Sequence, residues 1–242
     1  MNNHVYVADY NANELAGCDL KLCGKNEATT SNCFCSFHDT EIFKDIELKK
    51  YEYTKKQNFL YAYRAFSKVY FDKIDKRNSD IYQFQNCQEL CLSNECIINN
   101  IRGTIIDVEE FKKIKDIFNH ALDNEEFDII ETIIVTLDYE IRFATSYLNP
   151  VSYDFRGKQI NDPWDMTTPR KNIFVNIFPE AGKSYILISW LRSDSSYFVN
   201  YKEQFEEIMN LFLFGTSKIK NIGMEIEKNL VKFKCQFDLF KQ

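Results

Sequence analysis

Residues 171–192 read KNIFVNIFPEAGKSYILISWLR, two apolar runs separated by a short polar segment. Both runs are rich in β-branched and aromatic residues in an alternating pattern, which is typical of strands with a buried face. Residues 179–183, PEAGK, supply the proline and glycine that tight turns favour. The stretch therefore predicts an antiparallel β-hairpin.

A further β pattern precedes the hairpin. Residues 129–150, IIETIIVTLDYEIRFATSYLNP, alternate apolar and polar positions and end at Asn149-Pro150, so they predict a third, half-buried strand. Residues 154–170 contain one glycine and two prolines and predict a loop. A short strand is also expected at residues 4–10, and residues 11–35 read as loop.

Helical periodicity dominates the middle of the chain. Residues 57–77, QNFLYAYRAFSKVYFDKIDKR, have an apolar stripe at helical spacing, with Lys73 expected on the opposite, polar face. A second strong helix is predicted from Gly103 to residue 128, after a mostly helical segment at residues 80–101. Residues 38–49 and 196–215 also have helical spacing.

Strands and helices are thus segregated along the chain, which favours an α+β fold. We expect one globular domain over residues 1–242. Within it, residues 1–50 form a Cys-rich, zinc-finger-like lobe, residues 51–127 a helical part, and residues 128–242 a small antiparallel sheet with C-terminal helices.

Composition limits the function classes. The formal net charge of −6 gives no support for general nucleic-acid binding, because phosphate contacts need a basic surface. No run approaches the roughly 20 apolar residues of a membrane span, and the N-terminus lacks the pattern of a signal peptide. We therefore expect a cytoplasmic protein without membrane contact, whose 8 cysteines are reduced.

Four of those cysteines fall between residues 18 and 35. Cys18 and Cys23 form one closely spaced pair of soft ligands, and Cys35 and His38 form another, a pattern that fits tetrahedral zinc. Cys33 or His4 are alternative ligands. The alternative interpretation is that these thiols are small buried apolar residues. Zinc is the cofactor expected here, in a structural role.

A catalytic interpretation of the same region competes with the zinc lobe. His38, Asp39 and Glu47 lie on or near one short helix and could bind a divalent ion or act in metal-assisted hydrolysis, with Arg64 assisting. Asp39 is equally explained as a helix-start acid, Glu47 as a solvated residue and Arg64 as a snorkelling or ion-paired residue. A third hypothesis is a Cys35 nucleophile activated by His38.

The run CFCSFHDTEIFKDIE at residues 33–47, followed by QNFLYAYRAF, resembles a family of uncharacterised bacterial proteins with the signature GFC-x-x-HD-x-x-[IL]F-x-x-IE. Two departures are Cys33 in place of Gly and the absence of an upstream Ser-His element before His4. The resemblance implies an accessory or antiviral-defence role and no particular reaction. It carries over six positions, which are Cys35, His38, Asp39, Phe43, Glu47 and Arg64.

The sequence thus predicts a zinc-stabilised cytoplasmic binding or regulatory component, expected to act with a protein partner or as a homo-oligomer in bacterial phage defence. The alternative is a nuclease-like, metal-dependent hydrolase that uses His38, Asp39 and Glu47.

Overall fold

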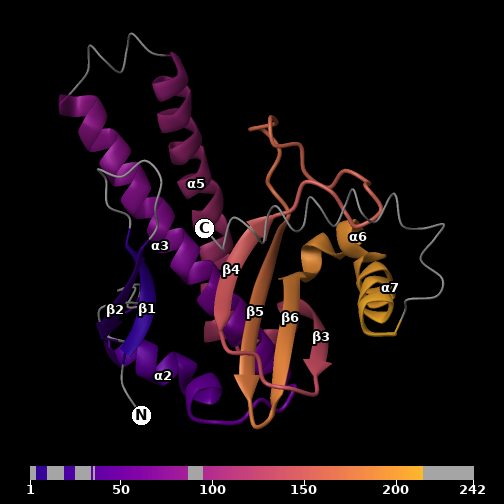
Figure 1. Ribbon diagram of the computed structural model, residues 1–242. Coiled ribbons are helices and arrows are strands. Elements are labelled where there is room, and N and C mark those ends of the chain that lie inside the picture. Colours follow the sequence, from indigo (N-terminus) through magenta and orange to yellow (C-terminus); the bar gives the residue numbers. More distant parts are fainter. Residues whose placement is uncertain (1–3, 10–18, 25–33, 35, 87–94, 215–242) are drawn as a thin grey trace. The chain divides into compact units, whose positions relative to one another are not determined.

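The structure, a computed structural model, describes residues 4–9, 19–24, 34, 36–86 and 95–214. Helices combine with an antiparallel sheet (Figure 1), which confirms the α+β class. The chain divides into two compact units, residues 1–32 with 215–242 and residues 33–214.

The first unit contains a two-stranded antiparallel ribbon. Strand β1 (His4–Asp9) matches the expected strand, and β2 (Asp19–Gly24) pairs with it. The sequence assigned residues 11–35 to loop, so β2 corrects that prediction. Its six residues, DLKLCG, have too short a pattern to identify a strand without the partner that it pairs with.

The second unit is built around a four-stranded antiparallel sheet with the order β3-β6-β5-β4. The predicted hairpin is confirmed as β5 (Asn172–Glu180) and β6 (Lys183–Leu191), the two central strands. Ala181 and Gly182 have φ angles of 53° and 82°. Two positive φ values in a two-residue loop match the right-handed twist of the strands.

The single strand predicted for residues 129–150 is wrong. That segment forms β3 (Ile130–Leu137), which pairs with β6, and β4 (Thr145–Pro150), which pairs with β5 at the opposite edge of the sheet. The intervening residues cross the end of the hairpin, where the Ile141 N–H donates to Ser184 Oγ at 2.8 Å. Alternating apolar residues on both sides of this crossing had concealed it.

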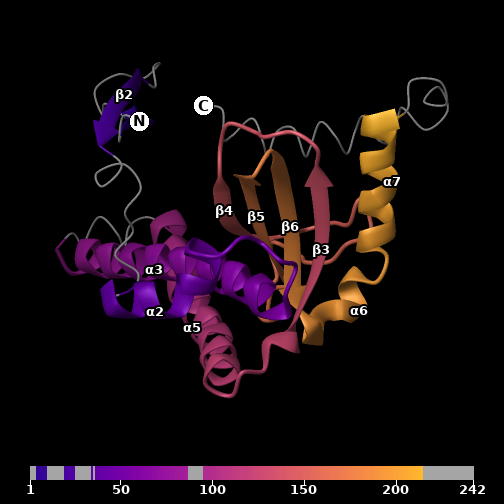
Figure 2. The ribbon, with the colours of Figure 1, turned by 90° about the horizontal axis from the view of Figure 1, so that it is seen from below.

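Helices cover both faces of the sheet (Figures 1 and 2). The long helices α3 (Lys55–Asn86) and α5 (Glu95–Asp123) pack on one face, and α2 (Ser36–Glu47) packs on α3. Helices α6 (Ser195–Phe198) and α7 (Tyr201–Phe214) contribute to the apolar core of the other face. The 3-10 turns η1 (Phe127–Ile129) and η2 (Arg192–Asp194) connect helices and strands.

Aromatic rings fill the layer between α3, α5 and the sheet. Phe118 of α5 is fully buried, with ring centroids 5.4 Å from Phe59, 5.2 Å from Phe66 and 5.5 Å from Phe174 of β5. These spacings are those of favourable aromatic pairs. The rings therefore fix the two long helices against each other and against the sheet.

Both long helices begin earlier than their sequence patterns suggested, and α5 ends at Asp123, before the predicted end at residue 128. The α3 helix begins after Thr54, whose Oγ1 accepts a hydrogen bond from the Gln57 N–H at 3.2 Å, as an N-cap residue does. The α5 helix runs without a break through Gly103, where the sequence predicted a helix start. None of the helices in the described residues is both long and apolar enough to cross a membrane.

Candidate functional site

The structure describes only part of the predicted zinc cluster. Cys18 and Cys35 lie outside the described residues. Cys23 belongs to β2, with its Cα opposite that of Val5, and His38 belongs to the first turn of α2. Among the described residues no three His, Cys, Asp or Glu side chains gather in a group fit to hold a metal ion. Zinc at Cys18, Cys23, Cys35 and His38 stays a prediction.

Two of the predicted catalytic residues lie side by side. Glu47, the last residue of α2, forms an ion pair with Arg64 of α3, with 2.8 Å between Oε1 and Nη2. The Arg64 guanidinium also lies 5.5 Å from the ring centre of the buried Phe43. Asp39 lies two turns earlier on the same helix.

This contact has the geometry of a surface ion pair. The Arg64 and Glu47 side chains are 44% and 36% exposed, and pairs in such surroundings contribute about 0–1 kcal/mol. The sequence left open whether Arg64 assists catalysis, snorkels or is ion-paired. The geometry matches an ion-paired residue whose guanidinium lies against an apolar side chain.

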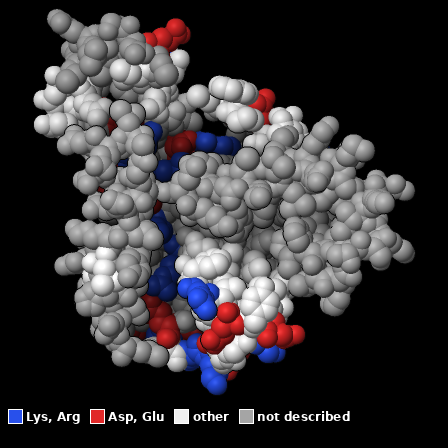
Figure 3. All heavy atoms as spheres, viewed as in Figure 1, with Lys and Arg blue, Asp and Glu red and all other residues white. Residues whose placement is uncertain are grey.

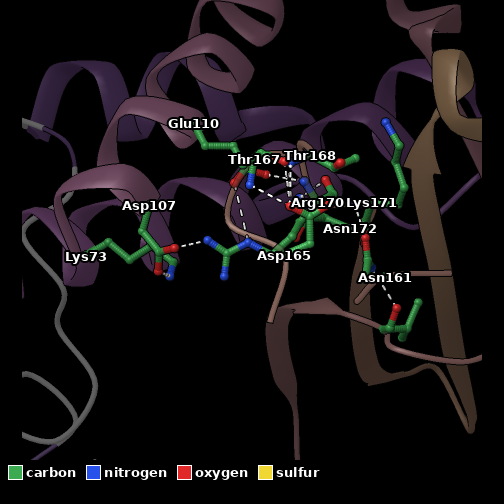
Figure 4. Close-up of polar contacts among 11 residues, drawn as sticks. Lys73, Asp107, Glu110, Asn161, Asp165, Thr167, Thr168, Arg170, Lys171 and Asn172 are labelled. Atoms are coloured by element: carbon green, nitrogen blue, oxygen red, sulfur yellow. Dashed lines mark hydrogen bonds and ion pairs between the residues drawn. The ribbon is translucent and has the colours of Figure 1, made fainter. Parts of the chain in front are cut away.

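A second constellation, which the sequence did not reveal, surrounds a pocket of about 470 Å³. We call it the α3–α5 pocket, because its walls come from α3, from α5 and from the segment between β4 and β5 (Figure 4). Its charged lining residues are Lys73, Lys76, Asp107, Glu110, Asp165 and Arg170.

Four of these side chains form a continuous network. Asp107 accepts hydrogen bonds from both Lys73 and Arg170. Glu110 accepts the backbone N–H of Arg170 at 2.6 Å and its Nε–H at 3.4 Å. Asp107 and Glu110 are three residues apart and therefore share one face of α5. Arg170 is thus held by two carboxylates of a helix that lies about 60 residues earlier in the chain.

The β4–β5 segment reaches α5 in a defined conformation. Asn161 donates to the carbonyl oxygens of Val151 and Lys171, at 2.6 and 2.8 Å, and accepts the Lys171 N–H at 2.8 Å, which joins the two ends of the loop. At its tip the Asp165 carboxylate accepts hydrogen bonds from the Thr167 N–H and hydroxyl, at 2.8 and 2.6 Å. The tip is therefore shaped by its own side chains.

Burial shifts the proton equilibria of the network. Desolvation, followed by repulsion from Arg170, lowers the pKa of Lys73 to about 8. Attraction to the Glu110 carboxylate acts in the opposite direction and is outweighed. Desolvation also raises the pKa of Glu110 and lowers that of Arg170. Charged side chains with shifted pKa values around a cavity are typical of functional sites.

The other wall of the pocket is apolar. It is lined by Ile106 of α5 and by Pro163 and Met166 of the β4–β5 segment. Met166 is 55% exposed and the adjacent Trp164 is 88% exposed, so large apolar groups stand beside the pocket in contact with solvent. On the face seen in Figure 3, by contrast, basic and acidic side chains of the described residues lie next to one another.

The position of Lys73 illustrates why this pocket is not evident from the sequence. Lys73 was expected on the polar face of its helix, yet its side chain is only 25% exposed and lies against Asp107, with its Nζ 4.8 Å from the ring centre of Phe111. That prediction was wrong. The signal in the sequence was its position three residues after Tyr70 of the apolar stripe, at the edge of the buried face.

Comparisons with known proteins give no match. No protein-family model, no curated protein sequence and no solved structure matches this chain. The resemblance to an uncharacterised bacterial family therefore stays a prediction.

Proposed function

We propose that this protein is a binding or regulatory component that takes up a small ligand in the α3–α5 pocket. One observation carries the proposal: four linked charged side chains, only 13–29% exposed, surround an open pocket. Apolar side chains of similar size would stabilise such a place equally well, because removing charges from water costs several kcal/mol per ion. A functional requirement explains why charges occupy it.

The pocket also has the composition of a ligand site. Its volume of about 470 Å³ falls within the range of small-molecule pockets, and it combines an apolar wall with a few directed polar groups. The β4–β5 segment supplies part of this lining and is anchored to α5 through Arg170. A bound ligand would therefore contact both elements at once, which suits a component that reports ligand binding.

Gly103 provides a sharp test. It lines the pocket, and a Cβ atom added there meets no heavy atom within 4 Å. Gly103→Phe would therefore fill the pocket without a clash at the backbone, while Gly103→Ala changes the same residue and leaves the pocket open. We expect thermal-shift screening with a panel of metabolites to find a compound that raises the Tm of the wild type and of Gly103→Ala but not of Gly103→Phe.

Two results would contradict the proposal. One is a panel in which no compound shifts the wild-type Tm. The other is a compound that shifts Gly103→Phe as much as the wild type, because that compound would bind elsewhere.

The zinc-stabilised N-terminal lobe remains part of this proposal, as does a role in antiviral defence. The metal content of purified wild type, compared with Cys35→Ala and His38→Ala, tests the lobe. We expect close to one zinc per chain in the wild type and loss of zinc and of folded structure in both variants. A wild type free of zinc would refute the lobe.

A metal-dependent hydrolase, in which Glu47 and Arg64 act with His38 and Asp39, is the alternative that the sequence predicted. Glu47 and Arg64 lie 2.8 Å apart, although their contact has the geometry of a surface ion pair. Nuclease assays with Mg²⁺ or Mn²⁺ test this candidate. We expect cleavage by the wild type that is lost in Glu47→Gln and Arg64→Gln while both variants stay folded. Absence of cleavage by the metal-loaded wild type excludes it.

A further inference from the structure

Two cations that line the α3–α5 pocket, Lys73 and Arg170, do not use all of their hydrogen-bond donors within the network. Both carboxylate oxygens of Asp107 and both of Glu110 accept hydrogen bonds from within the network. An ammonium group carries three donors and a guanidinium five. In the part of the chain that the structure describes, Lys73 Nζ donates to one oxygen, and Arg170 Nη1 donates to none. Each carboxylate oxygen is therefore engaged at least once, while Lys73 and Arg170, which line the pocket, retain N–H donors for a ligand.

Lys76 adds a third cation to the same wall. Its ammonium donates to Asn100 Oδ1 at 3.1 Å and lies 3.8 Å from an Asp80 oxygen, so it also retains N–H groups. Donors that lack acceptors are complemented by oxygen atoms, and charge-assisted hydrogen bonds to carboxylate or phosphate oxygens are the strongest type available to them.

The carboxylates limit the charge that the ligand carries. Asp107, Glu110 and Asp165 balance the three cations of the lining, so the pocket has no large positive field. A compact anion held by directed hydrogen bonds fits this balance, whereas a polyphosphate would meet the same carboxylates with several negative charges. The apolar wall formed by Ile106, Pro163 and Met166 matches an aromatic or aliphatic body on the ligand.

We infer that the ligand of the α3–α5 pocket is a small organic oxyanion, a carboxylate or phosphate monoester, attached to an apolar or aromatic body. Its oxygens accept hydrogen bonds from Lys73, Lys76 and Arg170, and its body packs on the apolar wall. This inference rests on the proposed ligand-binding function of the pocket.

Proton uptake should accompany binding. Lys73 faces Asp107 and Glu110 of α5, Arg170 of the β4–β5 segment and Lys76 of its own helix, and its pKa is lowered to about 8. An added oxyanion favours the ammonium form and so raises this pKa. Near pH 8, in the range of this lowered pKa, binding should take up a fraction of a proton, and affinity should fall as the pH rises further.

Isothermal titration of the full chain tests the inference with four probes: benzoate, phenyl phosphate, neutral benzamide and inorganic phosphate. We expect benzoate or phenyl phosphate to bind at least tenfold more tightly than both benzamide and inorganic phosphate. The measured heat at pH 8 should depend on the ionisation enthalpy of the buffer, as proton uptake requires.

Variants locate the binding. Lys73→Met should weaken the oxyanion probes at least tenfold, while Lys68→Met, which removes the same charge from an exposed position of the same helix, should leave them unchanged. Gly103→Phe should abolish binding and Gly103→Ala should retain it. Equal effects of the two lysine variants would overturn the inference.

The outcomes also separate this inference from the proposed function. If benzamide binds as tightly as benzoate and Gly103→Phe blocks both, the pocket binds ligands but the preference for an oxyanion is wrong. If inorganic phosphate matches phenyl phosphate, the role of the apolar wall is wrong. If no probe binds while the metabolite panel yields a pocket ligand without an oxyanion, only the inference fails; if the panel is also negative, both fail.

Discussion

Asp107→Asn is the most direct perturbation of the charged network. The carboxylate joins α3 to the β4–β5 segment, because Lys73 and Arg170 both donate to it. Asparagine has nearly the same shape and keeps one carbonyl oxygen, so one of the two hydrogen bonds can persist. The negative charge, however, is lost, and two cations then face Glu110 alone.

The expected cost follows from burial. Removing one partner of a fully buried ion pair costs roughly 3–5 kcal/mol, and a hydrogen bond to a charged group contributes about 1.5–3 kcal/mol. The Lys73, Asp107 and Arg170 side chains are 25%, 20% and 29% exposed, so water screens part of this interaction. We therefore expect Asp107→Asn to lower the free energy of unfolding by about 2 kcal/mol at pH 7.

The sign of the pH dependence gives a second criterion. Lys73 loses its charge as the pH rises through about 8, and a neutral amine depends less on a neighbouring carboxylate. The difference between wild type and Asp107→Asn should therefore be largest below pH 8 and should decrease towards pH 10. In the wild type, the lowered pKa of Lys73 alone makes stability rise with pH between about 8 and 10.5, because the unfolded chain binds more protons there.

Urea unfolding followed by the emission of Trp190, which is 5% exposed within the core, measures these differences. Glu109→Gln is the matched control, because it removes the same charge from an exposed position two residues along the same helix. Its effect should stay within about 0.5 kcal/mol. Asp107→Asn values that equal this control, or a difference that grows above pH 8, would refute the reasoning.

Three further predictions concern the second unit. Phe118→Ala should cost roughly 3–5 kcal/mol in urea unfolding, because the ring is fully buried, whereas Phe143→Ala, at a residue that is 52% exposed, should change stability by less than about 0.5 kcal/mol. Stability should fall as the pH rises above about 10. Burial raises the pKa of three tyrosines above the ordinary value of 10.0, so these tyrosines ionise at lower pH in the unfolded chain than in the folded one. Stability that stays constant to pH 11.5 would contradict this. These tyrosines are Tyr51, Tyr61 and Tyr201. Acrylamide should quench Trp164, which is 88% exposed, and Trp164→Phe should leave only the poorly quenched emission of Trp190; strong quenching in that variant would be inconsistent with the burial of Trp190.

Elements with a clear local pattern could be predicted from the sequence. The β5–β6 hairpin follows from two runs of β-forming residues around a turn, and α3 from its apolar stripe. Boundaries were less accurate, because the Thr54 cap and the continuation of α5 through Gly103 depend on contacts outside the apolar pattern. In α5, the burial of apolar side chains at helical spacing stabilises the helix by more than the roughly 1 kcal/mol that one glycine costs it.

The same distinction applies to the candidate sites. Contacts between segments close in the sequence could be predicted, and contacts between distant segments could not. The sequence singled out Glu47 and Arg64, and they lie in contact because α2 and α3 are adjacent in the chain and pack on each other. The α3–α5 pocket was not visible, because Lys73, Asp107 and Arg170 are separated by 34 and 63 residues. No local pattern connects charges at such distances.

The sequence by itself therefore determined the α+β class, the central hairpin and the main helices, since these depend on the period of apolar residues and on turn chemistry within short windows. Only the tertiary structure decided that residues 129–150 form two strands at opposite edges, and that Lys73 points into a charged network. Both features depend on which segments that are distant in the sequence come into contact. Strand pairing and the packing of helices on the sheet determine those contacts, and hence where a pocket forms.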